Sequence, residues 1–153
     1  MLTQVAGRSG RSGKRGKVII QTYNPNHPTI LQITKNDYAG MYKEQLQERL
    51  LYNYPPFFRL IKVTMKHRDY EKLRQGAEWL NEVLRQNLKL PVLGPEEPVI
   101  SRIRNEYIRT ILVKIPADQS LVSIKKTIQK ILDSFESISQ FRAIKIAVNV
   151  DFY

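Results

Sequence analysis

From Phe57 onward, segments with an apolar residue at every second position take turns with segments with one at every third or fourth position. This succession of segments is the feature that most restricts how the chain can fold. Apolar residues at every second position, or in a dense run rich in β-branched residues, are typical of strands. Apolar residues at every third or fourth position are typical of helices. The strand-like segments are 59–66, 107–115 and 144–152, and the helix-like segments are 69–88 and 118–134.

A further strand is expected between the first helix-like segment and the second strand-like one. Residues 91–94 and 99–104 suit a strand, but Pro95 and Pro98 would interrupt its hydrogen bonds, so we expect it to be broken or bulged. The resulting order, β-α-β-β-α-β, predicts an α+β domain of the ferredoxin-like class. In this class two helices pack on one face of an antiparallel sheet, and the other face is left open.

Two elements are predicted before this domain. Residues 17–23, KVIIQTY, are short, apolar and β-branched, which predicts a buried strand. A helix is predicted from Thr34 to about Tyr52, with Thr34 and Asp37 placed as a capping box. Its apolar stripe consists of Tyr38, Tyr42, Leu46 and Leu50.

The charge of the chain favours an anionic partner. Lys and Arg number 25 against 14 Asp and Glu, which gives a formal charge of +11. Residues 1–17 hold five of the basic residues and no acidic one. This balance favours nucleic acid as the partner. No apolar run is long enough to span a bilayer, and the chain begins without the apolar segment of a secretory signal.

The residue types that build metal or disulfide sites are scarce. The sequence has no Cys and two His residues far apart, which excludes disulfides and gives no zinc site. Gly7, Gly10, Gly13 and Gly16 recur at every third position among the arginines of the first segment. Two interpretations of this segment stay open: a solvated basic tail, or a loop whose backbone N–H groups and guanidiniums bind phosphate. It is not a Walker A loop, because Lys14 is followed by Arg15 instead of Ser or Thr.

A second basic cluster is predicted near the tight connection Asn105-Glu106. Arg102, Arg104 and Arg109 flank this turn, with Tyr107 between them, so two neighbouring strands would present three guanidiniums and one aromatic ring. The arginines would bind phosphates and the ring would stack on a base. The alternative is a solvated hairpin whose charge is partly neutralised by Glu106.

Short motifs give the chain a resemblance to a known family. Residues 4–11 read Q-x-x-G-R-x-G-R, which resembles motif VI of superfamily 2 helicases. The blocks VIIQTYNPNHPTI, DYAGMYKEQLQER, YPPFFRL, VLGP and VNVDF follow in order. This succession resembles the C-terminal part of the primosomal protein N′ family, the bacterial replication-restart DNA helicases. We therefore expect the chain to be a fragment of a longer protein, with the end of a RecA-like second helicase lobe at 1–56 and a C-terminal domain at 57–153.

The resemblance implies roles for the first segment in ATP hydrolysis. It makes Arg11 the arginine finger against the γ-phosphate of ATP, Arg8 a second phosphate contact, and Gln4 a polar contact that senses nucleotide, with Gly7 in the same loop. A guanidinium there offsets charge that develops during phosphoryl transfer. The family's lysine and Mg²⁺-binding carboxylates, and its zinc-binding cysteines, would all lie upstream. The parent is thus expected to be an ATP-dependent helicase, and this fragment alone to be inactive.

The resemblance also implies partners. The C-terminal domain would be similar in fold to a small-subunit ribosomal protein. It would help to bind branched and single-stranded DNA, single-strand-binding protein and other primosome proteins. The location would be the bacterial cytoplasm, at the nucleoid and not at a membrane. The expected DNA contacts are Lys14, Arg15, Arg102, Arg104, Tyr107 and Arg109. The alternative is a stand-alone nucleic-acid-binding module whose Gly/Arg tail is a binding arm. A small phosphatase of ferredoxin-like fold is less favoured, because the loop at Lys66–Asp69 has no Gly-rich anion cradle.

Overall fold

The computed structural model describes residues 17–152, and the chain divides into two compact units, Met1–Glu48 and Arg49–Tyr153. In the described part of the first unit, helix α2 spans Pro28–Thr34. Helix α3 spans Tyr38–Leu51, so it begins in the first unit and ends in the second. Pro28 occupies the first turn of α2, where its fixed φ suits a helix and its missing N–H costs no hydrogen bond.

The single helix predicted from Thr34 to Tyr52 is two helices, and the predicted capping box is wrong. Thr34 ends α2, and Asn36 then adopts a left-handed backbone with φ of 56°, which interrupts helical hydrogen bonding. Asp37 caps α3 by itself, since its Oδ1 accepts from the Gly40 N–H at 2.8 Å.

The strand predicted at 17–23 is also absent, because residues 17–27 contain no strand in the described part of the chain. Its apolar side chains are not buried there either, and Ile19 is 81% exposed. A strand needs a neighbour for its backbone N–H and C=O groups, and no described strand pairs with this segment. Apolar, β-branched composition therefore did not suffice to form a strand.

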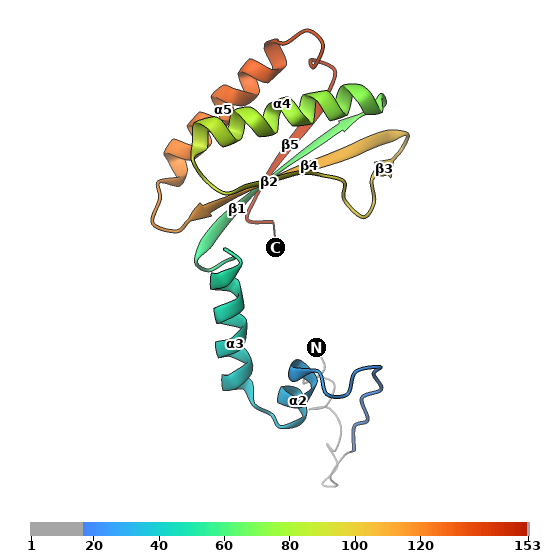
Figure 1. The fold of residues 1–153 in the computed structure, drawn as a ribbon, viewed down its shortest axis with the longest axis vertical. Coiled ribbons are helices and arrows are strands. Elements are labelled where there is room, and N and C mark those ends of the chain that lie inside the picture. Colours follow the sequence, from blue (N-terminus) through green and yellow to red (C-terminus); the bar gives the residue numbers. More distant parts are fainter. Residues whose placement is uncertain (1–16, 153) are drawn as a thin grey trace, which may run out of the picture. The chain divides into compact units, whose positions relative to one another are not determined.

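Beyond the end of α3, the described part of the second unit contains one sheet and two helices, arranged as Figure 1 shows. Its elements are β1 (Phe58–His67), α4 (Tyr70–Leu88), β2 (Val92–Glu96), β3 (Arg102–Ile103), β4 (Glu106–Pro116), α5 (Leu121–Ser137) and β5 (Lys145–Val150). The strands are ordered β2-β4-β1-β5, with β3 paired to β4 and every neighbour antiparallel. Helix α4 connects β1 to β2, which lie on either side of β4, and α5 connects β4 to β5, which lie on either side of β1. These two crossovers confirm the predicted ferredoxin-like class. The helicase lobe expected for residues 1–56 stays a prediction.

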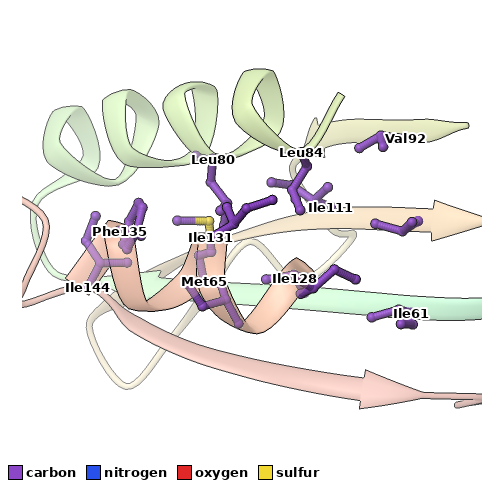
Figure 2. Packing of buried hydrophobic residues seen from close by; sticks show 14 of the residues in the cluster. Ile61, Met65, Leu80, Leu84, Val92, Ile111, Ile128, Ile131, Phe135 and Ile144 are labelled. Atoms are coloured by element: carbon purple, nitrogen blue, oxygen red, sulfur yellow. The ribbon is translucent and has the colours of Figure 1, made fainter. Parts of the chain in front are cut away.

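The core lies between the two helices and one face of the sheet (Figure 2). In the β1–β4 register Ile61 faces Val113 and Val63 faces Ile111, and all four side chains are at most 1% exposed. From the helices, Leu80 and Leu84 of α4 and Ile128, Ile131 and Phe135 of α5 pack onto these strands. The apolar face of the strands and the apolar stripes of the two helices thus pack together in one buried core, as predicted.

Local signals fix the ends of these elements. Asp69 caps α4, accepting at its Oδ1 from the Lys72 N–H at 3.0 Å. This hydrogen bond holds the pKa of the Asp69 carboxyl below its ordinary value. The expected broken strand is present as β2, whose register with β4 shifts between Leu93 and Glu96, and as the separate short β3. The turn from β3 to β4 is Arg104-Asn105, one residue earlier than predicted, and both residues have positive φ (50° and 62°), as type I′ turns require.

One lysine on the face without helices is buried. Lys114 of β4 is 6% exposed, and its Nζ donates to the Tyr52 carbonyl at 2.7 Å and lies 4.0 Å from the centre of the Tyr54 ring. Burial lowers the pKa of Lys114 below its ordinary value, because the charged form loses hydration. The segment that carries Tyr52 and Tyr54, which leads into β1, is thereby attached to the sheet.

We predict a pH-dependent contribution of Lys114 to stability. In the interval just below the ordinary lysine pKa of 10.5, the unfolded chain holds more protons at this position than the folded chain, so the free energy of unfolding rises with pH. Urea unfolding of the wild type and of Lys114→Met, from about pH 8 to 10.5, measures this term. The wild type should gain stability relative to the variant as pH rises. A difference that does not change with pH would contradict the assignment.

Candidate nucleic-acid interface

The residues predicted from motif VI and the basic segment lie outside the described part of the chain. These residues are Gln4, Gly7, Arg8, Arg11, Lys14 and Arg15. The structure therefore bears on only four of the predicted site residues, those of the β3–β4 hairpin.

The hairpin brings an arginine and an aromatic ring together. Arg102 of β3 is the register partner of Tyr107 of β4, and the guanidinium carbon lies 4.8 Å from the centre of the Tyr107 ring. Arg102 also donates to the Asn105 side chain. One face of the Tyr107 ring is thus covered by a cation, an arrangement that stabilises both groups. Arg104 lies in the turn and is exposed.

Arg109 is placed differently from the other two arginines. It lies two positions beyond Tyr107 on the same face of β4, and its side chain is 14% exposed. Its Nη2 donates to Glu97 Oε1 at 2.8 Å and to the Tyr70 hydroxyl at 2.7 Å, and that hydroxyl donates to Glu97 Oε1 at 3.0 Å. The Tyr70 and Tyr107 rings meet edge to face, with their centres 5.4 Å apart. Arg109 therefore joins α4, the loop after β2 and β4 in one cluster.

Sequence reasoning did not identify Tyr70 or Glu97 as members of this cluster. Arg109 lies 39 residues from Tyr70 and 12 from Glu97, so no local spacing relates them. The pairing of β2 with β4 and the packing of α4 against β4 bring them together. Glu97 is the acid that pairs with a hairpin arginine, whereas Glu106, the acid named in the alternative interpretation of a solvated hairpin, pairs with Lys145.

A second group of cations lies at the same end of the sheet. Lys66 of β1 is the register partner of Lys145 of β5, and the Lys145 Nζ donates to Glu106 Oε1 at 2.6 Å. This hydrogen bond, together with the charges of Lys145, Arg68 and Lys66, holds the pKa of the Glu106 carboxyl below its ordinary value. The alternation in β1, which puts Lys62 and Lys66 on the face without helices, is a signal that could have identified this group.

The described residues offer no metal site and no membrane-spanning element. Across 17–152, no three His, Asp or Glu side chains lie close enough together to hold a metal ion. Within the same residues, no helix is both long and apolar enough to cross a bilayer. The positive observations are a cationic sheet end and a hairpin that supplies both an aromatic ring and arginines, which suits the binding of phosphates.

The fold and this surface define a small basic α+β domain, and comparison with known families is consistent with that. The model of the primosomal protein N C-terminal domain matches residues 51–152, so the chain belongs to that family.

Curated relatives extend the similarity beyond this domain. The replication restart protein PriA of Bacillus subtilis is 34% identical over 156 residues, covering 100% of this chain and 19% of that protein. The protein of the same name from Synechocystis sp. is 37% identical over 136 residues, covering 87% of this chain and 16% of that protein. The one from Thermotoga maritima is 31% identical over 151 residues, covering 99% of this chain and 19% of that protein. The chain thus spans about a fifth of the length of these relatives.

We predict that Glu97 stabilises the hairpin through Arg109. Glu97→Gln keeps the shape of the side chain but removes the charge opposite a guanidinium that is largely shielded from water. We expect the free energy of unfolding to fall by about 1 kcal/mol. The matched control is Glu78→Gln, which removes an exposed surface partner of Arg74 on α4 and should change stability less. Urea unfolding of both variants is the measurement, and an equal loss in the two would show that Arg109 does not depend on Glu97.

Proposed function

We propose that this chain is the C-terminal part of a bacterial replication-restart DNA helicase. The observation that carries the proposal is that a relative named replication restart protein PriA aligns with the whole chain, the glycine- and arginine-rich first segment as well as the domain. The coarse role, replication restart, comes from the names of these relatives. The finer roles below rest on the motif VI resemblance and on the geometry of the hairpin.

In this proposal the first segment works at an ATP site completed by protein upstream. Arg11 places its guanidinium against the γ-phosphate, Arg8 binds a second phosphate oxygen, and Gln4 contacts the nucleotide, with Gly7 allowing close approach of the backbone. The upstream lysine and carboxylates would hold ATP and Mg²⁺, and zinc would bind upstream cysteines. The residues of this chain would then supply charge stabilisation and no proton transfer.

The domain would bind DNA through its hairpin and the nearby lysines. Arg102 and Arg104 bind phosphates, the half-buried Tyr107 contacts a base with the exposed part of its ring, and Arg109 positions the hairpin. Lys14 and Arg15 would add phosphate contacts. The substrate would be branched and single-stranded DNA at stalled forks, in the bacterial cytoplasm at the nucleoid. Single-strand-binding protein and other primosome proteins would be the protein partners.

We predict that Arg11 is required for hydrolysis but not for binding of ATP. In the longer protein, Arg11→Ala should lower the DNA-stimulated kcat by about 10³-fold, the effect of removing an arginine finger, and leave the Kd for ATP nearly unchanged. Lys17→Ala, which removes another cation from the same segment, is the matched control and should keep kcat. The 153-residue chain by itself should hydrolyse no ATP. Unchanged turnover in Arg11→Ala would remove this residue from the role.

A second candidate function is a stand-alone nucleic-acid-binding module whose first segment is the binding arm. The specific observation in its favour is the concentration of five basic residues and no acidic one in residues 1–17. Flexible basic arms bind phosphates with little sequence preference. The two functions differ in where DNA affinity resides.

We predict that residues 49–153 keep much of the DNA affinity of the whole chain. This shortened chain retains Tyr52, so Lys114 keeps its acceptor. Titration of labelled single-stranded DNA over a range of salt concentrations compares it with the full chain. The arm hypothesis predicts instead that most affinity is lost and that the slope of log affinity against log salt falls by about 3.5, for five phosphate contacts.

A further inference from the structure

Apolar side chains are exposed in the loop that leads into β3, at the end of β3 opposite the Arg104-Asn105 turn. The apical loop, defined here as residues 97–101, connects β2 to β3. Within it Val99 is fully exposed and Ile100 is 65% exposed, and Ile103 just beyond it is 44% exposed. Isolated apolar side chains are common on protein surfaces, but several adjacent ones mark a contact surface.

The apical loop is attached to the domain at both ends. At its start, the Glu97 carboxylate accepts from Arg109 at 2.8 Å and from the Tyr70 hydroxyl at 3.0 Å. At its end, the Ser101 carbonyl accepts from the Ile108 N–H at 2.8 Å. Because these bonds hold the two ends against β4, Val99 and Ile100 are kept out of the core and in solvent.

The charge around the apical loop identifies the kind of partner. Arg102 and Arg104 follow the loop directly, Glu106 beyond them is paired with Lys145 at 2.6 Å, and Lys66 is the register partner of Lys145. Two acidic residues, Glu96 and Glu97, lie on the β2 side of the loop, and Glu97 is paired with Arg109. A partner that offers negative charge to these cations and apolar surface to Val99 and Ile100 is a nucleic acid with exposed base faces.

We propose that Val99 and Ile100 insert against unstacked bases where duplex DNA opens into single strands, while Arg102 and Arg104 hold the adjacent phosphates. Base faces are covered by stacking in a duplex and become available at a fork, so the apical loop gains its contact only there. Apolar side chains of other proteins enter base steps in this way. The inference rests on the proposed function, since it specifies which DNA structure the same hairpin recognises.

The test compares forked DNA, carrying 2-aminopurine at its junction, with a fully paired duplex of equal length. In the wild-type chain the junction fluorescence should change on binding, and the fork should be preferred. Val99→Ser and Ile100→Ser should each lower the fork-over-duplex preference by about ten-fold, as expected for loss of one base contact, and suppress the fluorescence change. Val122→Ser on α5 removes an apolar side chain that is 65% exposed, as Ile100 is, and is the matched control, which should alter neither.

The arginines should behave differently from the apolar pair. Arg102→Gln and Arg104→Gln should each weaken binding to fork and duplex alike and reduce the salt slope by about one. If Val99→Ser and Ile100→Ser bind both DNAs as the wild type does, the insertion is overturned and the loop is a protein contact instead. If the wild-type chain binds neither DNA, the proposed DNA-binding function fails and the insertion with it.

Discussion

The antiparallel pairing of β1 with β4 determines the position of every other feature of the second unit. It runs from Phe58 opposite Pro116 to His67 opposite Tyr107 without a bulge. Side chains alternate between the faces of a strand, so a slip of one residue would turn the buried Ile61, Val63 and Met65 toward the open face. The same slip would turn Arg109 away from Tyr70. Burial of the core thus fixes the register, and the register places the polar clusters.

Strand β4 has an apolar middle and two polar ends, and each end uses a partner from a distant part of the chain. At its start, Tyr107 and Arg109 join β3, α4 and the loop after β2. Near its end, Lys114 takes the carbonyl of Tyr52. In both places a cation is stabilised by a hydrogen-bond acceptor and by a nearby aromatic ring. A single strand therefore supports the candidate binding surface at one end and the entry of the chain into the domain at the other.

Much of this fold could be predicted from the sequence, because its strands and helices have clear periodicity and caps. Asp69 before α4 and the alternation of β1 are examples. Local composition misled at 17–23, where apolar residues have no partner strand. Contacts across the sheet, such as Arg109 with Glu97, depend on tertiary pairing and carry no local signal. The arginines of the hairpin were recognised from charge, but their unequal exposure was not.

The buried ammonium of Lys114 restricts the length of the segment between α3 and β1. Adding or deleting one residue after Tyr52 would displace its carbonyl by roughly 3 Å, the rise of one extended residue. The ammonium would then lie in an apolar environment without an acceptor, which costs more than the lost hydrogen bond alone. Connections between secondary structure elements usually tolerate changes in length, but the Lys114–Tyr52 hydrogen bond leads us to expect that this one does not. Natural variation in this family should therefore spare the spacing between these residues even where their side chains differ.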